Sequence, residues 1–442
     1  MTAGLLRQGQ VVLAEKAGLP CLIIELIGGG GQGEVYRAQL GDASVAVKWY
    51  RPDVASELQH RALAELVRRG APSSAFLWPM DIVTAPRVAG FGYVMPLRDE
   101  RFIGLSDLVR RLVEPPARVL ATAGIWLAEA FLNLHSEGLC YRDISLGNAF
   151  VDPASGEVLV CDNDNVAVDG VISGGVLGTP RFMAPEVVRG EAYPSSRTDL
   201  FSLAVLLFMM LFVHHPFEGA REHSYALMDL GAMRDLYGDH PVFIFDPDDD
   251  SNRPVPGTHR NALELWPFYP RALRDLFTQA FTAGVVDPAD SRVRESQWRK
   301  ALVRLRDSVM TCDACGGDAE RFWDPLEPWH DAPCWRCGAR IGPPSVLAFG
   351  AGALVVVSHG ASIFPHHTDS ARLYDFSEHT GEVVRHPDHP SMLGLRNCST
   401  RTWQVKGPGG RVQEVRPSQS VRLAPGSIIN FSPGTAEVRA GA

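Results

Sequence analysis

Three short patterns between Tyr141 and Glu186 constrain the fold of this chain more than any other stretch. In order, they read YRDISLGN, VLVCDNDN and GTPRFMAPE. Asp143 stands five residues before Asn148, and Asp162 follows Asn148 by fourteen residues, directly after an apolar run. Asx residues are common in turns, but turn caps have no reason to keep these spacings. Each pattern alone is short, and only their joint order and spacing is specific.

In this order and spacing, the patterns resemble the catalytic loop, the metal-binding loop and the end of the activation segment of eukaryotic-type protein kinases. The resemblance covers residues 11–306 and implies two lobes with ATP bound between them. It implies that Asp143 orients a substrate hydroxyl, while Asn148 and Asp162 hold Mg2+ on the phosphates. The competing interpretation is a degenerate kinase fold without activity, because a fold alone does not establish a function.

The resemblance also assigns partners within and beyond the activation segment. Thr179 is expected to touch Asp143, as in kinases that are specific for serine and threonine. Glu186 is expected to form a buried ion pair. Arg292 occupies the expected late position for its partner, and Arg294 is the second choice.

Two features of the same region concern the catalytic loop and its regulation. Asp199, at the start of an apolar helical stretch, is expected to anchor the catalytic loop. Ser173 is the candidate regulatory phosphorylation site. In the family, the arginine before the catalytic aspartate, here Arg142, supplies a cation for a phosphate on this segment.

Four positions depart from the family pattern. Tyr141 replaces the usual histidine, which we interpret as an architectural change. Ser145 replaces a lysine that contacts the transferred phosphate, and losing a cation from the transition state predicts slower transfer. Asn163 replaces a phenylalanine and cannot pack as an aromatic side chain does. Asp164 replaces a glycine and is either a second metal ligand or an exposed turn residue.

A glycine-rich stretch precedes these patterns. Gly28, Gly30, Gly33 and Val35 fit G-x-G-x-x-G-x-V, and Lys48 follows on a predicted strand. Alone, a glycine run is more often a flexible turn. A predicted strand follows it directly, whereas a dinucleotide-binding fingerprint would be followed by a helix. The kinase resemblance implies that these residues cover the ATP phosphates and that Lys48 contacts them.

Two more elements of the nucleotide site are expected between Lys48 and the catalytic loop. Residues 54–69 predict a helix, which in the family carries a glutamate that pairs with the lysine. Glu57 and Glu65 both remain candidates, and the alternative is that both are solvent-facing charges. The strand FGYVMPL leads to the predicted hinge, where Met95 is expected to line the adenine pocket. An ordinary core strand explains the apolar pattern of this segment equally well.

Two C-x-x-C pairs follow the predicted kinase lobes. Four thiolates at this spacing predict a tetrahedral structural zinc site, formed by Cys312, Cys315, Cys334 and Cys337. A redox-active cysteine pair is the alternative. The small core of this segment is expected to be packed by three tryptophans, with a partner surface as the other interpretation: Trp323, Trp329 and Trp335.

The last hundred residues predict a small all-β sandwich, because short apolar stretches alternate with turns. Residues 394–405, with Asn397 and Ser399 in a loop, and residues 421–431 resemble the second half of a forkhead-associated domain. Domains of that family bind phosphothreonine, so a phosphoprotein is the candidate partner. The first half lacks the elements that grip the phosphate, and a docking or packing module is the alternative.

Composition limits the other function classes. The net charge is −9 and 21% of residues are charged, which gives no general attraction to nucleic acid or to an anionic membrane. The N-terminus lacks the pattern of a secretory signal, and the cysteine usage is typical of a reducing compartment. We therefore expect a cytoplasmic protein with neither a nucleic-acid nor a membrane partner.

Together these features predict an α+β protein with four regions: a kinase N-lobe at 1–97, a C-lobe at 98–308, a zinc ribbon at 309–342 and a forkhead-associated-like sandwich at 343–442. The predicted function is an ATP-dependent serine/threonine kinase that uses Mg2+, contains Zn2+ and acts on a protein substrate. The appended regions resemble those of bacterial kinases from tellurite-resistance-type stress clusters. The alternative is a nucleotide-binding pseudokinase scaffold acting through its C-terminal domains.

Overall fold

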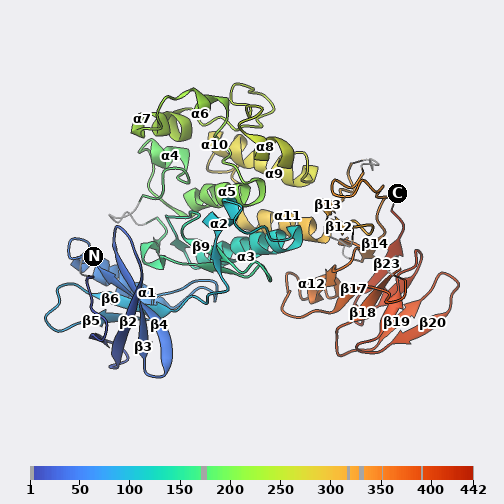
Figure 1. The fold of residues 1–442 in the computed structure, drawn as a ribbon, viewed down its shortest axis with the longest axis horizontal. Coiled ribbons are helices and arrows are strands. Elements are labelled where there is room, and N and C mark those ends of the chain that lie inside the picture. Colours follow the sequence, from blue (N-terminus) through green and yellow to red (C-terminus); the bar gives the residue numbers. More distant parts are fainter. Residues whose placement is uncertain are drawn as a thin grey trace. The chain divides into compact units, whose positions relative to one another are not determined.

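The computed structural model (Figure 1) describes residues 4–170, 177–315, 319–327, 333–350, 352–389 and 392–441. Internal contacts divide the chain into two compact units. Unit 1 comprises Met1–Pro115, Ala123–Leu263 and Leu276–Arg299. Unit 2 comprises Pro116–Thr122, Glu264–Asp275 and Lys300–Ala442. The predicted regulatory residue Ser173 and the predicted packing residue Trp329 lie outside the described residues.

The N-terminal part of unit 1 is a closed sheet of six antiparallel strands in the order β1-β2-β3-β4-β6-β5 (Figure 1, blue). Their buried residues alternate with exposed ones in β1 and in the first half of β2, which places one row of side chains inside. The strand predicted directly after the glycine-rich loop is confirmed as β3. The bounds are β1 (Val11–Ala14), β2 (Pro20–Gly29), β3 (Gly33–Leu40), β4 (Ala43–Tyr50), β5 (Asp81–Thr84) and β6 (Gly92–Pro96).

One helix, α1 (Glu57–Arg69), accompanies this sheet in the region predicted to be helical. Its first turn is capped by Ser56, whose side chain accepts a hydrogen bond from the backbone N–H of Gln59. Gly70 ends the helix with a positive φ of 81°, a conformation that glycine adopts without a steric penalty. Leu63 and Leu66 are the buried residues of α1.

The core of the second lobe is α5 (Ser196–Phe212). Ser195 and Thr198 form a reciprocal capping box at its start, and almost every later side chain is buried. A helix buried all round needs no polar face. This explains why the most apolar stretch of the sequence is a helix interior. On α5, Phe208 packs edge-to-face on Phe277, with ring centroids 5.3 Å apart.

The long helix α3 and several shorter helices complete the helical region. The helices are α2 (Leu105–Val109), α3 (Ala117–Ser136), α4 (Pro185–Val188), α6 (Ala220–Ser224), α7 (Leu230–Arg234), η2 (Asp235–Asp239), α8 (Arg260–Leu265), α9 (Arg271–Phe281), α10 (Ala283–Val286) and α11 (Glu295–Asp307). By length and composition alone, α3 is a candidate membrane span, but half of its apolar window is buried inside the structure, as in the core helix of a globular lobe.

Two small sheets and a short 3-10 helix hold the predicted catalytic and metal-binding loops. One sheet has the order β10-β9-β7 and the other pairs β11 with β8. The bounds are β7 (Ile103–Gly104), β8 (Leu139–Cys140), β9 (Ala149–Val151), β10 (Val158–Val160), η1 (Asn163–Asn165) and β11 (Ala167–Val168). The antiparallel pair β9–β10 brings the end of one loop next to the start of the other.

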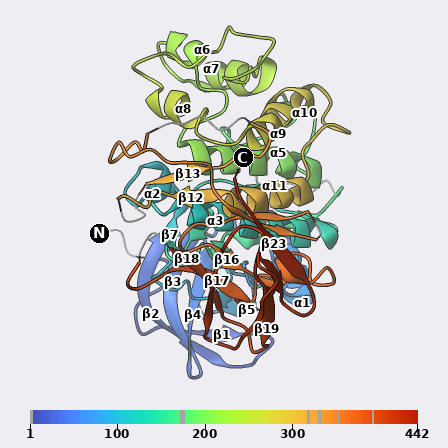
Figure 2. The same cartoon turned by 90° about the vertical axis from the view of Figure 1, so that its right-hand side faces the viewer.

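Most of unit 2 is built from two antiparallel sheets that share one hydrophobic core (Figure 2). The orders are β15-β14-β23-β22-β19-β20 and β16-β17-β18-β21. Trp403 is fully buried in the core, and the polar residues of β19 alternate with it toward solvent. The bounds are β14 (Val346–Phe349), β15 (Leu354–Val356), β16 (Ser362–Ile363), β17 (Gly381–Arg385), β18 (Leu393–Asn397), β19 (Trp403–Lys406), β20 (Val412–Val415), β21 (Ser420–Arg422), β22 (Ile428–Asn430) and β23 (Thr435–Arg439).

Within unit 2, the end of α11 is joined to the short helix α12 (Pro365–Thr368) by buried polar contacts. The imidazole Nε2 of His367 lies 3.1 Å from the carboxylate of Asp307. The Arg306 guanidinium lies over the ring of Phe376, 4.2 Å from its centroid. The strands β12 (Val309–Thr311) and β13 (Glu320–Phe322) follow α11 and pair antiparallel.

Candidate active site and metal centre

Lys48 is placed by the pleat of the N-terminal sheet. It lies on β4 directly opposite Tyr93 on β6, and Tyr50 lies two residues further along β4. Residues two apart on a strand, and residues paired across two strands, project from the same face of a sheet. The ammonium group and the two phenols therefore converge on one point. The side chain of Lys48 is almost completely buried.

Asp164 fills the point where these three groups converge. Lys48 Nζ lies 3.0 Å from each carboxylate oxygen, and the hydroxyls of Tyr50 and Tyr93 donate to the same carboxylate at 2.7 and 2.9 Å. The carboxylate of Asp164 is fully buried. The prediction of an exposed turn residue is therefore wrong, because a buried carboxylate with a cation and two donors is stabilised inside the protein.

The electrostatics of the cluster agree with this geometry. Burial alone would lower the pKa of Lys48, but the carboxylates of Asp164 and Asp162 outweigh it and raise that pKa. Burial and the neighbouring Asp164 carboxylate raise the pKa values of Tyr50 and Tyr93 well above the usual range of a phenol. Both phenols consequently remain protonated donors, and Lys48 remains a cation.

Helix α1 does not supply the expected glutamate. Glu57 pairs with Arg61 at 2.9 Å, and Glu65 pairs with Arg68 and Arg69 on the exposed face of the helix. Within the described part of the chain, neither carboxylate is within ion-pair distance of Lys48. The expectation of a pair between Lys48 and a glutamate of α1 is therefore wrong for this structure.

The residue of α1 that reaches the cluster is an uncharged one. The amide Nε2 of Gln59 donates to the hydroxyl of Tyr50 at 3.2 Å and lies 3.5 Å from the backbone carbonyl of Asp164. The sequence analysis did not identify Gln59, which lies in the first turn of α1, because it considered the glutamates of this helix. The indication in the sequence was the two tyrosines on the same face as Lys48. Buried phenol hydroxyls need hydrogen-bond partners, and Asp164 and Gln59 supply them.

Asp162 lies beside the cluster at the start of η1. Its backbone has a φ of 53°, in the left-handed region. One carboxylate oxygen lies 3.5 Å from Lys48 Nζ, and the side chain stays partly exposed. Burial raises the pKa of Asp162, Lys48 opposes that effect, and the carboxylates of Asp164 and Asp143 add to it. A divalent cation would relieve the repulsion between these carboxylates, so the donor set suits Mg2+.

The glycine-rich loop contacts the same cluster through Gln32. Its amide oxygen accepts a hydrogen bond from Lys48 Nζ at 2.9 Å, and its Nε2 donates to Asn165 at 3.0 Å. Gly33 is required by close packing, because an added Cβ would lie 2.2 Å from the backbone oxygen of Trp49.

The other predicted nucleotide-contacting residues surround Lys48. An added Cβ at Gly28 or Gly30 would meet nothing within 4 Å, which leaves the space beside this part of the loop open. Val35 pairs with Lys48 across β3 and β4. Met95 is buried in a cluster against which Val35 and Cys161 pack. The predicted roles of these residues toward ATP stay predictions.

Asp143 is held between two other predicted site residues. The hydroxyl of Thr179 donates to one carboxylate oxygen at 2.8 Å, which confirms the predicted contact. The amide Nδ2 of Asn148 lies 3.1 Å from the other oxygen and 2.9 Å from the backbone carbonyl of Asp143. The amide oxygen of Asn148 is thereby turned away from Asp143. The arrangement can present one carboxylate to a hydroxyl and one amide oxygen to a cation.

The catalytic loop is fastened to both neighbouring elements. Asp199 accepts hydrogen bonds from the backbone N–H groups of Tyr141 and Arg142, so the predicted anchor is confirmed. The hydroxyl of the fully buried Tyr141 donates to the backbone carbonyl of Cys161, the residue before Asp162. Tyr141 therefore ties the catalytic loop to the metal-binding loop, which agrees with the architectural role predicted for it.

The end of the activation segment is fixed by a buried ion pair. Glu186 lies 2.7 Å from the guanidinium of Arg292, which also donates to the carbonyl of Arg197. The first choice of partner is thus confirmed and Arg294 is not the partner. A second pair, between Arg181 and Glu218, was not predicted from the sequence. Although Glu218 is buried, His215, Arg181 and a hydroxyl donor hold its pKa at about 2.

The four cysteines of the two C-x-x-C pairs meet in unit 2. Their sulfurs all lie within 4.8 Å of one another, with 3.7 Å between Cys312 and Cys337 and 3.9 Å between Cys315 and Cys334. A tetrahedral Zn2+ with bonds of about 2.3 Å requires sulfurs about 3.8 Å apart. The donor set and the spacing fit zinc. The pKa of the Cys334 thiol is lowered to about 7, because backbone and thiol donors outweigh its burial.

The two described tryptophans near the cysteines, Trp323 and Trp335, do not share the predicted core. Trp323 packs against a small cluster formed by Met310, Val346 and Val356. Trp335 is 67% exposed, so the prediction that it packs the core is wrong. A short segment between closely spaced metal ligands has little room to bury a large ring.

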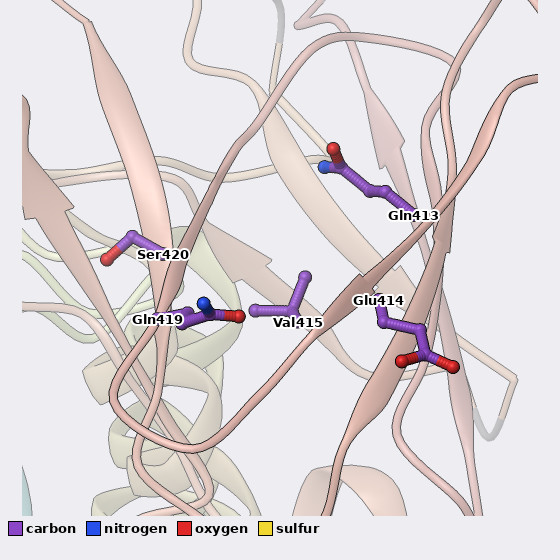
Figure 3. A pocket seen from close by; sticks show the side chains of 5 residues that line it. All are labelled: Gln413, Glu414, Val415, Gln419 and Ser420. Carbon is purple, nitrogen blue, oxygen red and sulfur yellow. The ribbon is translucent and has the colours of Figure 1, made fainter.

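A hollow in unit 2 lies between strand β20 and the start of β21 (Figure 3). It has a volume of about 360 Å³ and is lined by Gln413, Glu414, Val415, Gln419 and Ser420. Among these five residues there is a carboxylate and no cation. Such a lining does not suit a phosphate group.

Comparison with known proteins agrees with the geometry. Residues 22–254 match the model of the protein kinase domain family. Three similar proteins are the DNA damage-responsive serine/threonine-protein kinase RqkA of Deinococcus radiodurans, the serine/threonine-protein kinase AfsK of Streptomyces coelicolor and the serine/threonine-protein kinase PknK of Mycobacterium bovis. Their identities are 30%, 26% and 32%, over 46%, 50% and 44% of this chain. The matches span 31%, 28% and 18% of the relatives' own lengths.

Proposed function

Because this chain belongs to the protein kinase domain family, we propose that it transfers the γ-phosphate of ATP to serine or threonine hydroxyls of a protein substrate. The observation that carries the proposal is the double support of Asp143, by the hydroxyl of Thr179 and the amide of Asn148. A carboxylate held in this way is ready to accept a hydrogen bond from a hydroxyl nucleophile.

The residues divide the chemistry among them. Asp143 accepts the proton of the substrate hydroxyl and orients its oxygen for in-line attack. Lys48 faces the phosphates of ATP under the glycine-rich loop. Asn148 and Asp162 would hold Mg2+, which when bound neutralises phosphate charge. Catalysis by such a site consists mainly of positioning and charge neutralisation.

The test is phosphate transfer from labelled ATP with Mg2+, comparing the intact chain with Asp143→Asn. The matched control is Asp42→Asn, the same change at an exposed turn residue. We expect transfer by the intact chain and by the control, and loss of transfer in Asp143→Asn with ATP binding retained. Equal transfer by all three proteins would overturn the proposed mechanism.

A pseudokinase scaffold is the second candidate, and two residues favour it. Ser145 leaves the catalytic loop without its usual lysine, and Asn163 is buried where the family has an aromatic ring. In that case the chain binds ATP as a structural ligand, and the melting temperature rises with ATP while no phosphate is transferred. An active kinase and a pseudokinase scaffold are therefore both expected to bind ATP, but only the active kinase transfers phosphate.

The cysteine cluster is proposed to hold one structural Zn2+. Four thiolates leave no open coordination position, so the ion would stabilise the fold of the segment between β12 and β14 instead of acting on a substrate. Metal analysis of the purified chain should return one zinc per molecule. Replacement of Cys334 by serine should lower that ratio.

The two sheets of unit 2 are proposed to form an interaction domain of the forkhead-associated type with a phosphoprotein partner. Asn397 supports a loop that such a partner would meet, because its amide donates to the carbonyl of Arg401 and accepts from Ser399. Arg401 is exposed on this loop and can pair with a phosphate. Phosphothreonine peptides should bind the intact chain and lose affinity on Arg401→Ala, whereas unphosphorylated peptides should not bind.

The biological setting is proposed to be bacterial stress signalling in the cytoplasm. One relative is named as DNA damage-responsive. The expected likeness of the appended regions to those of kinases from tellurite-resistance-type clusters points in the same direction. Deletion of the gene should increase sensitivity to DNA damage or tellurite, and a gene encoding Asp143→Asn should fail to restore resistance.

A further inference from the structure

We propose that Asp164 is a positioning residue that holds Lys48 in place for phosphate transfer, in the role that the family gives to a glutamate of the helix here called α1. This inference rests on the proposed function and names a residue of the same site. Lys48 contacts Asp164, whereas the glutamates of α1 pair with arginines of their own helix.

Lys48 has one dominant charged partner, beside the neutral amide oxygen of Gln32 at 2.9 Å. Its ammonium nitrogen lies 3.0 Å from both carboxylate oxygens of Asp164, and 3.5 Å from the nearest oxygen of Asp162. The side chains of Lys48 and Asp164 are 5% and 0% exposed, so solvent screens their attraction little. Asp162 remains partly exposed and retains an oxygen for a metal ion. The two aspartates therefore serve different purposes.

Asp164 is itself held by a rigid frame. The phenols of Tyr50 and Tyr93 donate one hydrogen bond to each of its oxygens. Both tyrosines lie on β4 and β6, the paired strands that also fix Lys48. A carboxylate with three donors on two backbone-fixed strands loses little entropy when the nucleotide arrives. The same saturation leaves Asp164 poorly suited to bind a metal ion.

Among the described residues, the side chain by which α1 reaches this frame is the neutral amide of Gln59. Gln59 donates to the Tyr50 hydroxyl, while Glu57 and Glu65 are bound to arginines of their own helix. A shift of α1 would break the two contacts of the Gln59 amide, to the Tyr50 hydroxyl and to the backbone carbonyl of Asp164, and neither belongs to the charge pair of Lys48 and Asp164. The orientation of Lys48 is thus built into the sheet and the metal-binding loop.

The experiment measures the position of Lys48 directly. An acyl-phosphate analogue of ATP transfers its acyl group to the lysine amine beside the phosphates, and peptide mass spectrometry identifies the labelled residue. We compare the intact chain with Asp164→Asn at a saturating concentration of the analogue and at several pH values. The series separates position from protonation, because only the neutral amine is acylated and, against the effect of burial, the Asp164 carboxylate raises the pKa of Lys48. The matched controls are Glu57→Gln and Glu65→Gln, which are the same change from carboxylate to amide.

We expect labelling of Lys48 to fall on the order of 10- to 100-fold in Asp164→Asn, since small displacements of a reacting group have effects of this size. The dissociation constant for ATP should change about threefold or less, which corresponds to about 0.6 kcal/mol. Both glutamate controls should label as the intact chain does. Unchanged labelling in Asp164→Asn, or a comparable loss in either control, would overturn the inference.

Two further variants keep the test decisive if Asp164→Asn fails to fold. Tyr93→Phe removes one donor from Asp164 and keeps both charges, and it should reduce labelling severalfold. Lys48 of the double variant Glu57→Gln/Glu65→Gln should be labelled as in the intact chain. A loss of labelling in this variant would show that a glutamate of α1 positions Lys48. Because labelling needs no phosphate transfer, an intact chain that labels as expected but transfers no phosphate would refute the kinase proposal and leave this inference standing.

Discussion

Removing Arg292 tests the most buried ion pair of the activation segment. Its guanidinium lies 2.7 Å from the carboxylate of Glu186 and donates to the carbonyl of Arg197. The side chain of Arg292 is 4% exposed and that of Glu186 is 14% exposed. Burial lowers the pKa of Arg292 and Glu186 opposes this effect. The change Arg292→Ala therefore leaves a buried carboxylate and a carbonyl without their donor.

The expected loss is large because the pair is broken on one side only. Leaving one member of a buried ion pair uncompensated costs about 3–5 kcal/mol. In a folded unit of about 150–250 residues, each kcal/mol lowers the melting temperature by about 2–4 °C. Arg292→Ala should therefore lower the melting temperature of the transition that contains α5 by about 6–20 °C.

The assay is differential scanning calorimetry of the full chain. Arg294→Ala is the control, since Arg294 is the same residue type two positions away and is exposed. We expect Arg294→Ala to shift the transition by about 1 °C or less, as exposed sites usually do. The double change Glu186→Gln/Arg292→Met, which removes both charges, should recover part of the loss. Equal melting temperatures for Arg292→Ala and Arg294→Ala would refute the reasoning.

Three other predictions concern protonation, catalysis and metal. His135, buried between Asp199 and Glu295, has its pKa raised to about 9, because its two carboxylate partners outweigh burial. Protonated His135 contributes about 3 kcal/mol to the free energy of unfolding. This contribution is complete below the unfolded pKa of about 6.5 and is lost as pH rises through about 9. The denaturation midpoint should therefore fall between these two pH values, and His135→Gln should make the midpoint less dependent on pH. Thr179→Val should reduce kcat by about 10- to 100-fold with KM for ATP unchanged, because only the orientation of Asp143 is disturbed. A zinc chelator should lower the melting temperature of unit 2 in the intact chain and have no effect on Cys334→Ser; a chelator-insensitive intact chain would contradict the zinc site.

Much of the candidate site could be predicted because its parts are local in sequence. Asp143, Asn148 and Asp162 lie within twenty residues of one another, and the contact from Thr179 follows from the same pattern. The strands that carry the glycine-rich loop and Lys48 could also be predicted one by one, because apolar stretches alternate with turns there. Local spacing fixes which loops exist, and short hairpins such as β9–β10 then bring them together.

The partner of Lys48 could not be predicted from local patterns, because it depends on tertiary position. Glu57 and Glu65 have arginines three or four residues away on their own helix, and such pairs form readily on a helix surface. This spacing can be seen in the sequence, and it argues against either glutamate as the partner of Lys48. The tyrosines at positions 50 and 93 lie on the face of Lys48 by strand periodicity, which was the missed indication of a buried acceptor.

The two replacements in the metal-binding loop, Asn163 and Asp164, are best understood together. Asn163 is fully buried, and its amide Nδ2 donates to the carbonyl of Val160 at 3.0 Å, so the turn is fixed by a polar contact where the family uses an aromatic ring. Asp164 then ties the same turn to Lys48 and two phenols. With both attachments made inside the sheet and the loop, a displacement of α1 changes little. Regulation of this site is therefore expected to act on the activation segment, whose ordered end is held by Glu186 and Arg292.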